Sequence, residues 1–116
     1  MAKKILIAED DEAILDVVKS ILESEGHTVL IPRDEHHLYK IVHEEVPDLI
    51  LLDIWLQGAD GGKIAKNLKA KPATKDIPVI LMSANNSTER IAKEAGADGF
   101  LLKPFALEEL LNIISH

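Results

Sequence analysis

Four short apolar runs in this chain each end at polar residues that could take part in metal or phosphoryl chemistry. These residues are Glu9 and Asp10 after the first run, Asp53 after the second, Ser83 after the third and Lys103 after the last. If the runs are parallel strands, their carboxyl ends meet at one edge of a sheet, where α/β proteins bind ligands. Three carboxylates, a hydroxyl and an ammonium would then lie together.

This set of side chains suits a divalent cation and a phosphoryl group. Carboxylates placed close together repel unless a cation compensates, and Mg²⁺ accepts carboxylates while keeping positions for water and phosphate oxygens. An aspartate in that setting can attack phosphorus. Lys103 would supply a positive charge and Ser83 a donor to a phosphoryl oxygen. Taken singly, each residue could instead be a helix cap, a turn residue or a surface lysine, so the interpretation depends on their shared placement.

The elements that must position these residues alternate along the chain. Continuous apolar runs of four or five residues are typical of strands buried on both faces, and apolar residues at helical spacing follow each of them. The strands are predicted at Lys4–Ala8, Thr28–Ile31, Leu49–Leu52, Val79–Met82 and Gly99–Leu102. The helices are predicted at Glu12–Glu25, Glu35–Glu45, Gly62–Lys71, Thr88–Ala95 and Ala106–Ser115, with Ser87 as an N-cap and Gln57–Gly61, Pro72–Pro78 and Ala84–Ser87 as loops.

This alternation predicts an α/β fold of the (βα)5 type. Right-handed crossovers give a doubly wound, five-stranded parallel sheet with helices on both faces. The length of 116 residues and the lack of a linker predict one domain over residues 1–116.

Composition excludes several functions. There are no cysteines, so disulfides and thiolate metal sites are ruled out. The net charge of −7 argues against direct nucleic-acid binding, which needs a basic footprint. No apolar stretch could span a membrane and no signal peptide is recognisable, so we expect a cytoplasmic protein.

The motifs, in their order and spacing, resemble the receiver domain of bacterial two-component response regulators, the chemotaxis-type fold. The resemblance extends from Lys4 to Ile114 and implies the flavodoxin-like strand order 2-1-3-4-5. Its motifs are ILIAEDDE at 5–12, PDLILLD at 47–53, Asp60-Gly61, Met-Ser-Ala at 82–84, AGADGF at 95–100, and Lys103-Pro104-Phe105.

The family's site roles map onto matching positions. By resemblance, Asp53 is the phosphoacceptor, which takes a phosphoryl group from the phosphohistidine of a sensor histidine kinase or a histidine phosphotransfer protein. Asp10, Asp53 and the backbone carbonyl of Trp55 would bind Mg²⁺, with Glu9 acting through a metal-bound water, and Mn²⁺ could substitute. Lys103 would hold the acyl phosphate, and its bond to Pro104 is usually cis in this family.

The resemblance also implies a switch. Phosphorylated Asp53 would draw in the Ser83 hydroxyl, and Phe100 would turn inward, changing the surface of the fourth helix, fifth strand and fifth helix. That surface would control a downstream protein target or an output domain. Phosphorylation-dependent homodimerisation through the fifth helix is a further alternative. The protein would phosphorylate and slowly dephosphorylate itself without turning over an external metabolite, so it is not expected to be an enzyme in the metabolic sense.

Two positions depart from the family pattern. Gln57 stands where the family usually has proline, and the bulky Trp55, like Asn85, lies at a position that influences autodephosphorylation. Trp55 could shield the acyl phosphate from water or contact a partner.

Alternative functions fit less well. A flavodoxin is excluded because the acidic run after the first strand would repel a phosphate, and an aspartyl-phosphate phosphatase would need an acid where Trp55 stands. A degenerate receiver that only binds proteins remains the main alternative.

Overall fold

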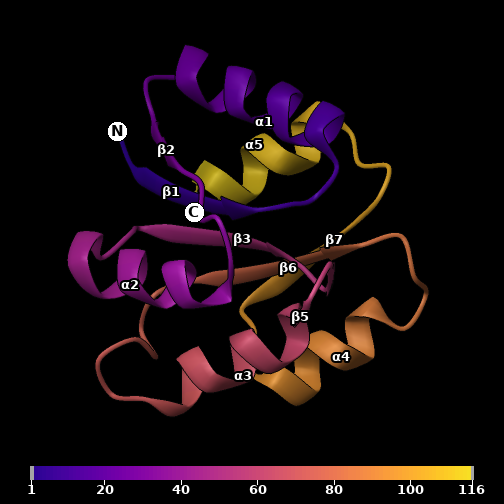
Figure 1. Cartoon of the computed structure of the whole chain (residues 1–116). Coiled ribbons are helices and arrows are strands. Elements are labelled where there is room, and N and C mark those ends of the chain that lie inside the picture. The colour runs from indigo at the N-terminus through magenta and orange to yellow at the C-terminus, as the bar shows by residue number, and fades with distance from the viewer. Residues whose placement is uncertain (1, 116) are drawn as a thin grey trace.

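The computed structural model describes residues 2–115, which form one parallel sheet between two layers of helices (Figure 1). The sheet has the lateral order β2-β1-β3-β6-β7, and every neighbouring pair is parallel. This is the predicted order 2-1-3-4-5 once the small hairpin between β3 and β6 is left out of the count. The strands are β1 (Lys4–Ala8), β2 (Thr28–Leu30), β3 (Leu49–Asp53), β6 (Val79–Ser83) and β7 (Gly99–Leu102).

Helices cover both faces of the sheet, as predicted. Within residues 2–115, none of them is both long and apolar enough to cross a bilayer. On one face lie α1 (Glu12–Ser24) and α5 (Leu107–Ser115), and on the other lie α2 (Glu35–Glu45), α3 (Gly61–Ala70) and α4 (Thr88–Ala95).

The strands divide their side chains between two cores. In β1, Ile5 and Ile7 join the cluster under α1 and α5, whereas Leu6 and Ala8 join the cluster under α2, α3 and α4. Successive strand residues point to opposite faces, so a strand covered on both sides must be apolar throughout. Each large side chain buried here contributes about 1.5–3 kcal/mol. The apolar runs are therefore continuous up to the carboxyl edge, where polar residues begin.

The N-caps of two helices differ from the sequence prediction, although both helices begin where predicted. The capping role left open for Glu9 and Asp10 belongs to Asp11, whose carboxylate accepts from the amides of Ala13 and Ile14 at 3.0 and 3.2 Å. Ser87 precedes α4 as predicted but makes no capping hydrogen bond with its side chain. Its hydroxyl donates instead to the side-chain oxygen of Asn85, at 2.6 Å.

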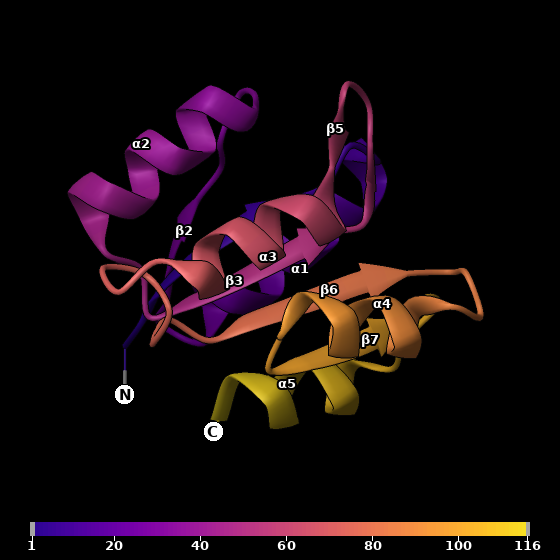
Figure 2. The same cartoon turned by 90° about the horizontal axis from the view of Figure 1, so that it is seen from below.

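A small antiparallel hairpin replaces most of the predicted loop at 57–61. It pairs β4 (Trp55–Leu56) with β5 (Ala59–Asp60), and α3 begins at once at Gly61. The two-residue turn is possible because Gly58 adopts a φ of 76°. In Figure 2 the hairpin rises steeply from the end of β3 towards which its arrowhead points. The carboxyl edge of the sheet therefore has a structured flap beside it.

Candidate functional site

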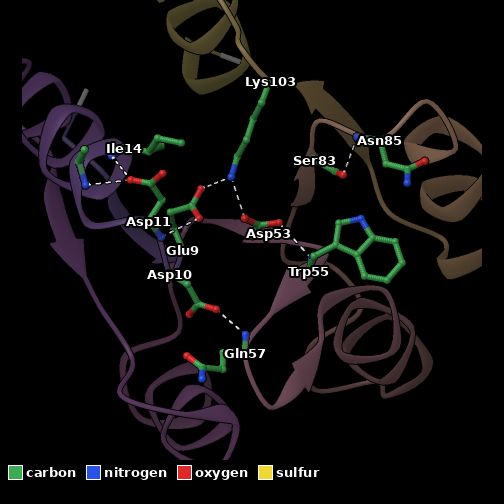
Figure 3. A network of polar contacts seen from close by, with 11 residues as sticks. Glu9, Asp10, Asp11, Ile14, Asp53, Trp55, Gln57, Ser83, Asn85 and Lys103 are labelled. Atoms are coloured by element: carbon green, nitrogen blue, oxygen red, sulfur yellow. Dashed lines mark hydrogen bonds and ion pairs between the residues drawn. The ribbon is translucent and has the colours of Figure 1, made fainter.

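Strand register brings the candidate residues together at one edge. Ala8 pairs with Leu52, and Ser83 pairs with Leu102, so each strand ends level with its neighbour. The edge therefore carries, from one strand to the next, Glu9, Asp53, Ser83 and Lys103 (Figure 3).

Lys103 joins the two buried carboxylates of the site. Its ammonium donates to Asp53 Oδ2 at 2.7 Å and to Glu9 Oε1. The three side chains are only 15% (Lys103), 9% (Asp53) and 2% (Glu9) exposed. Such a buried pair gains more from Coulomb attraction than a surface pair does, but it also costs desolvation. A cluster of this kind is weak evidence for stability and better evidence for a functional role.

The surroundings of Glu9 and Lys103 shift the pKa of each of these two groups. Burial, and then the neighbouring Asp53 carboxylate, raises the pKa of Glu9 above its ordinary value, and Lys103 offsets part of this rise. Burial alone would lower the pKa of Lys103, but Asp53 and Glu9 outweigh it and raise that pKa. The site thus holds two crowded carboxylates around one ammonium. Because it has an excess of negative charge, a further cation would be favoured there.

Asp53 is oriented through both of its side-chain oxygens. Oδ1 accepts the backbone N–H of Trp55 at 3.0 Å, while Oδ2 faces Lys103. Trp55 begins the hairpin, so the flap and the strand end are linked at this carboxylate. Trp55 is 58% exposed, and Figure 3 shows its indole beside Asn85 and its backbone next to Asp53.

Ser83 and Lys103 are held in a fixed relation by the sheet. The backbone N–H of Lys103 donates to the carbonyl of Ser83 at 2.9 Å. The buried Ser83 hydroxyl accepts the N–H of Asn85 at 3.0 Å. The peptide bond between Lys103 and Pro104 is cis, as the resemblance implied.

Phe100 lies on β7, away from this polar cluster. Its side chain is half-buried and packs against the core cluster under α2, α3 and α4. It pairs in register with Leu81 on β6, two residues before Ser83. Its role as a switch stays a prediction.

Among the three acidic candidates, Asp10 is the one whose side chain turns away from Lys103. Its Oδ2 accepts the backbone N–H of Gln57 in the hairpin, and Figure 3 shows it directed away from Lys103. Accordingly, within residues 2–115 no group of three or more acidic, histidine or cysteine side chains is arranged to hold a metal ion.

The donors nevertheless fit Mg²⁺ chemically. Glu9 and Asp53 supply hard carboxylate oxygens with an excess of negative charge, and the Trp55 carbonyl follows Asp53 in the chain. Asp10 is exposed, and to join them its side chain would have to turn from the Gln57 N–H.

Gly61 is a site-supporting residue whose role the sequence did not reveal. It lies directly against the last peptides of β3, and its N–H donates to the carbonyl of Ile54 at 2.8 Å. The motif Asp60-Gly61 was noticeable in the sequence, but nothing local to it indicates contact with Asp53.

Comparison with models of protein families identifies the family of this chain. The model of the response regulator receiver domain matches residues 5–115. This chain belongs to the response regulator receiver domains. Receiver domains of two-component systems are signalling switches rather than metabolic enzymes.

Solved structures agree with this assignment. A putative response regulator from Chloroflexus aurantiacus is 26% identical, with a TM-score of 0.92 over 99% of this chain and 96% of that one. NtrX from Brucella abortus is 32% identical with a TM-score of 0.87. The match spans 99% of this chain but only 27% of the NtrX chain. The receiver domain of a Pseudomonas aeruginosa sensor histidine kinase is 26% identical, with a TM-score of 0.88 and coverages of 99% and 96%. That structure holds a magnesium ion in its active-site cleft.

Proposed function

We propose that this receiver domain is a phosphoacceptor switch that takes a phosphoryl group onto Asp53. The donor would be the phosphohistidine of a sensor histidine kinase or of a histidine phosphotransfer protein. The observation that carries the proposal is the Lys103 ammonium, which is held between the buried carboxylates of Glu9 and Asp53 at the carboxyl edge. A buried lysine held at Asp53 can form a charge-assisted hydrogen bond to a phosphoryl group attached there.

In this reaction an Asp53 oxygen attacks phosphorus while the nitrogen–phosphorus bond of the donor breaks. The Lys103 ammonium would exchange its contact with the Asp53 carboxylate for one with a phosphoryl oxygen, and the Ser83 hydroxyl would donate to another phosphoryl oxygen. Bound Mg²⁺, or Mn²⁺ in its place, supplies neutralisation of the phosphoryl charge. Asp10, Asp53 and the Trp55 carbonyl would hold it directly, and Glu9 through a water.

The signal would leave the site through Ser83 and Phe100. When Ser83 turns to the phosphoryl group, its bond to the Asn85 N–H is lost and the segment before α4 moves. Phe100 would then repack, changing the surface of α4, β7 and α5. That surface would act on a downstream protein or an output domain, or pair two copies. We expect this to occur in the cytoplasm.

Trp55 is proposed to lengthen the lifetime of the acyl phosphate. Its indole lies on the exposed side, beside Asn85, and could keep attacking water away from Asp53. We expect Trp55→Ala to dephosphorylate several-fold faster than the wild type and Trp55→Phe to stay close to it. Substitution of Asn85, which lies beside the indole in Figure 3, should also alter the rate. An unchanged or slower decay of Trp55→Ala, followed by mass spectrometry, would leave Trp55 as a partner contact.

The function itself is tested by intact-protein mass spectrometry with acetyl phosphate as donor. One phosphoryl adduct is expected with Mg²⁺, none with chelator and none on Asp53→Asn. Asp48→Asn is the matched control, because Asp48 also lies beside β3 but at the opposite end of the strand, and it should still form the adduct. If the folded wild type forms no adduct in any condition, the protein is a degenerate, phosphorylation-independent binding module.

A further inference from the structure

The hydrogen bond between Asp10 and the hairpin opposes the arrangement that metal binding needs. Asp10 comes from the β1–α1 loop and Gln57 from the tip of the β4–β5 hairpin, 47 residues apart in the chain. The N–H of Gln57 donates to the carboxylate of Asp10 and directs it away from Glu9 and Asp53. Asp10 can join the other carboxylates only by giving up this donor or turning past it.

The donor at position 57 is free for this bond because of the turn geometry. Residues 57 and 58 are the two turn residues between β4 and β5, so the N–H of Gln57 takes no part in the strand pairing. Among residues 2–115, Val46 is the only residue other than glycine with a positive φ, so the φ of Gln57 is negative while that of Gly58 is 76°. This combination is that of a type II turn, in which proline is favoured at the first position.

Leu56 and Ala59 hold the hairpin by packing against the core, whereas the two turn residues between them extend beyond that packing. A cavity of about 130 Å³ separates Leu56, Gln57 and Gly58 from Arg33 and Asp34 at the start of α2. Gln57 and Gly58 are themselves exposed. The bond to Asp10 is therefore the principal polar link between the hairpin tip and the β1–α1 loop.

We propose that the Gln57 N–H competes with the metal ion for Asp10, making Gln57 a positioning residue that weakens Mg²⁺ binding. Asp10 exchanges this donor for the cation, and the hairpin tip is released in the same step. The inference rests on the proposed function, because it assumes that Asp10 is a metal ligand. The donor is the backbone N–H, so any residue other than proline at position 57 should form the same hydrogen bond. Only proline removes it.

The test compares Gln57→Pro with Gln57→Ala in Mg²⁺ titrations without any phosphodonor. Proline removes the N–H and suits the turn, whereas alanine keeps the N–H and removes only the side chain. Trp55 is the only tryptophan in the chain and begins this hairpin, so its fluorescence can report binding. We expect Gln57→Pro to bind Mg²⁺ about fivefold more tightly, the effect of one solvent-exposed charged hydrogen bond, and Gln57→Ala to match the wild type.

A second readout observes the bond directly. In the wild type the amide proton of Gln57 should resonate downfield and move upfield as Mg²⁺ saturates the site, which a purely structural role of Gln57 would not produce. Equal Mg²⁺ affinities for all three proteins, with a stationary Gln57 resonance, would overturn the inference and leave the proposed function intact. If no variant binds Mg²⁺ by isothermal calorimetry, the metal-dependent function and the inference fail together.

Discussion

A β-carbon added to Gly61 would lie 2.0 Å from the backbone carbonyl oxygen of Asp53. It would also lie 2.8 Å from the α-carbon of Ile54, so its neighbours are backbone atoms that cannot rotate away. The start of α3 therefore fixes the peptide of Asp53, the proposed phosphoacceptor.

Gly61→Ala should displace this peptide and cost at least about 2 kcal/mol of unfolding free energy, since overpacked backbone must shift. Adduct formation from acetyl phosphate should fall as well. Gly62→Ala is the matched control in the same helix. There the nearest atom is the Cγ2 methyl of Ile91 at 3.0 Å, a side-chain atom rather than backbone, which can give way more easily. Urea unfolding that shows equal losses for both variants would contradict this account of Gly61.

Lys69 is a buried cation with a structural task. Its side chain is 12% exposed, and its ammonium donates to the carbonyls of Lys75 and Ile77 at 2.9 and 2.8 Å and pairs with Asp98 at 2.5 Å. Lys69→Met would leave these acceptors without their donor, so we expect a loss of about 2–4 kcal/mol in unfolding free energy.

None of the Lys69 partners belongs to the proposed phosphoryl site, so the folded Lys69→Met variant should still form the adduct. The exposed Lys66 on the same helix provides a control, and Lys66→Met should change stability by less than about 0.5 kcal/mol. Loss of adduct formation by a Lys69→Met protein that is still folded would show a role in the site.

Val46 ends α2 in a strained conformation. Its φ of 45° and ψ of 68° are in the left-handed region, which costs a β-branched residue about 1–2 kcal/mol, and its side chain is 60% exposed. Val46→Gly should therefore raise the free energy of unfolding by about 1 kcal/mol. Val17 is equally exposed but helical, so Val17→Gly should lower it by roughly 0.5 kcal/mol. Chemical denaturation should give opposite signs for the pair, and equal signs would contradict the strain argument.

Sequence patterns were sufficient to predict the parallel sheet and to predict that the candidate site residues lie together at its edge. Alternation and crossover handedness predict the parallel sheet with helices on both faces, and the resemblance to receiver domains implies the strand order. The ends of the apolar runs locate Glu9, Asp53 and Lys103 on one edge. This works because buried parallel strands must be apolar until they reach the edge, so the first polar residue marks it.

The sequence could not predict in which direction the site's side chains point or which backbone N–H groups they bind. Asp10 is adjacent to Glu9 in sequence, yet it turns to the hairpin because a free N–H at Gln57 is available there. The hairpin itself has strands of only two residues, too short for any periodicity to appear. Lys69 looks like one more lysine on a lysine-rich helix, and only packing against distant carbonyls makes it different.

Tyr39 offers a direct test of the charge environment between α2 and α3. It is the only tyrosine, so absorbance at alkaline pH reports its ionisation alone. Burial raises the pKa of its hydroxyl above the ordinary 10.0, although a hydrogen bond donated by Asn67 at 3.1 Å lowers it in part. The midpoint should therefore lie above that of the urea-unfolded chain, and Asn67→Ala should raise it further.

The same shift determines how Tyr39 affects stability. Between the two midpoints the unfolded chain has released the tyrosine proton while the folded chain keeps it, so stability should fall as pH rises through this window. Tyr39→Phe should lack this part of the decline, as urea unfolding at matched alkaline pH values can measure. A folded-state midpoint at or below that of the unfolded chain would contradict the burial of the hydroxyl between the helices.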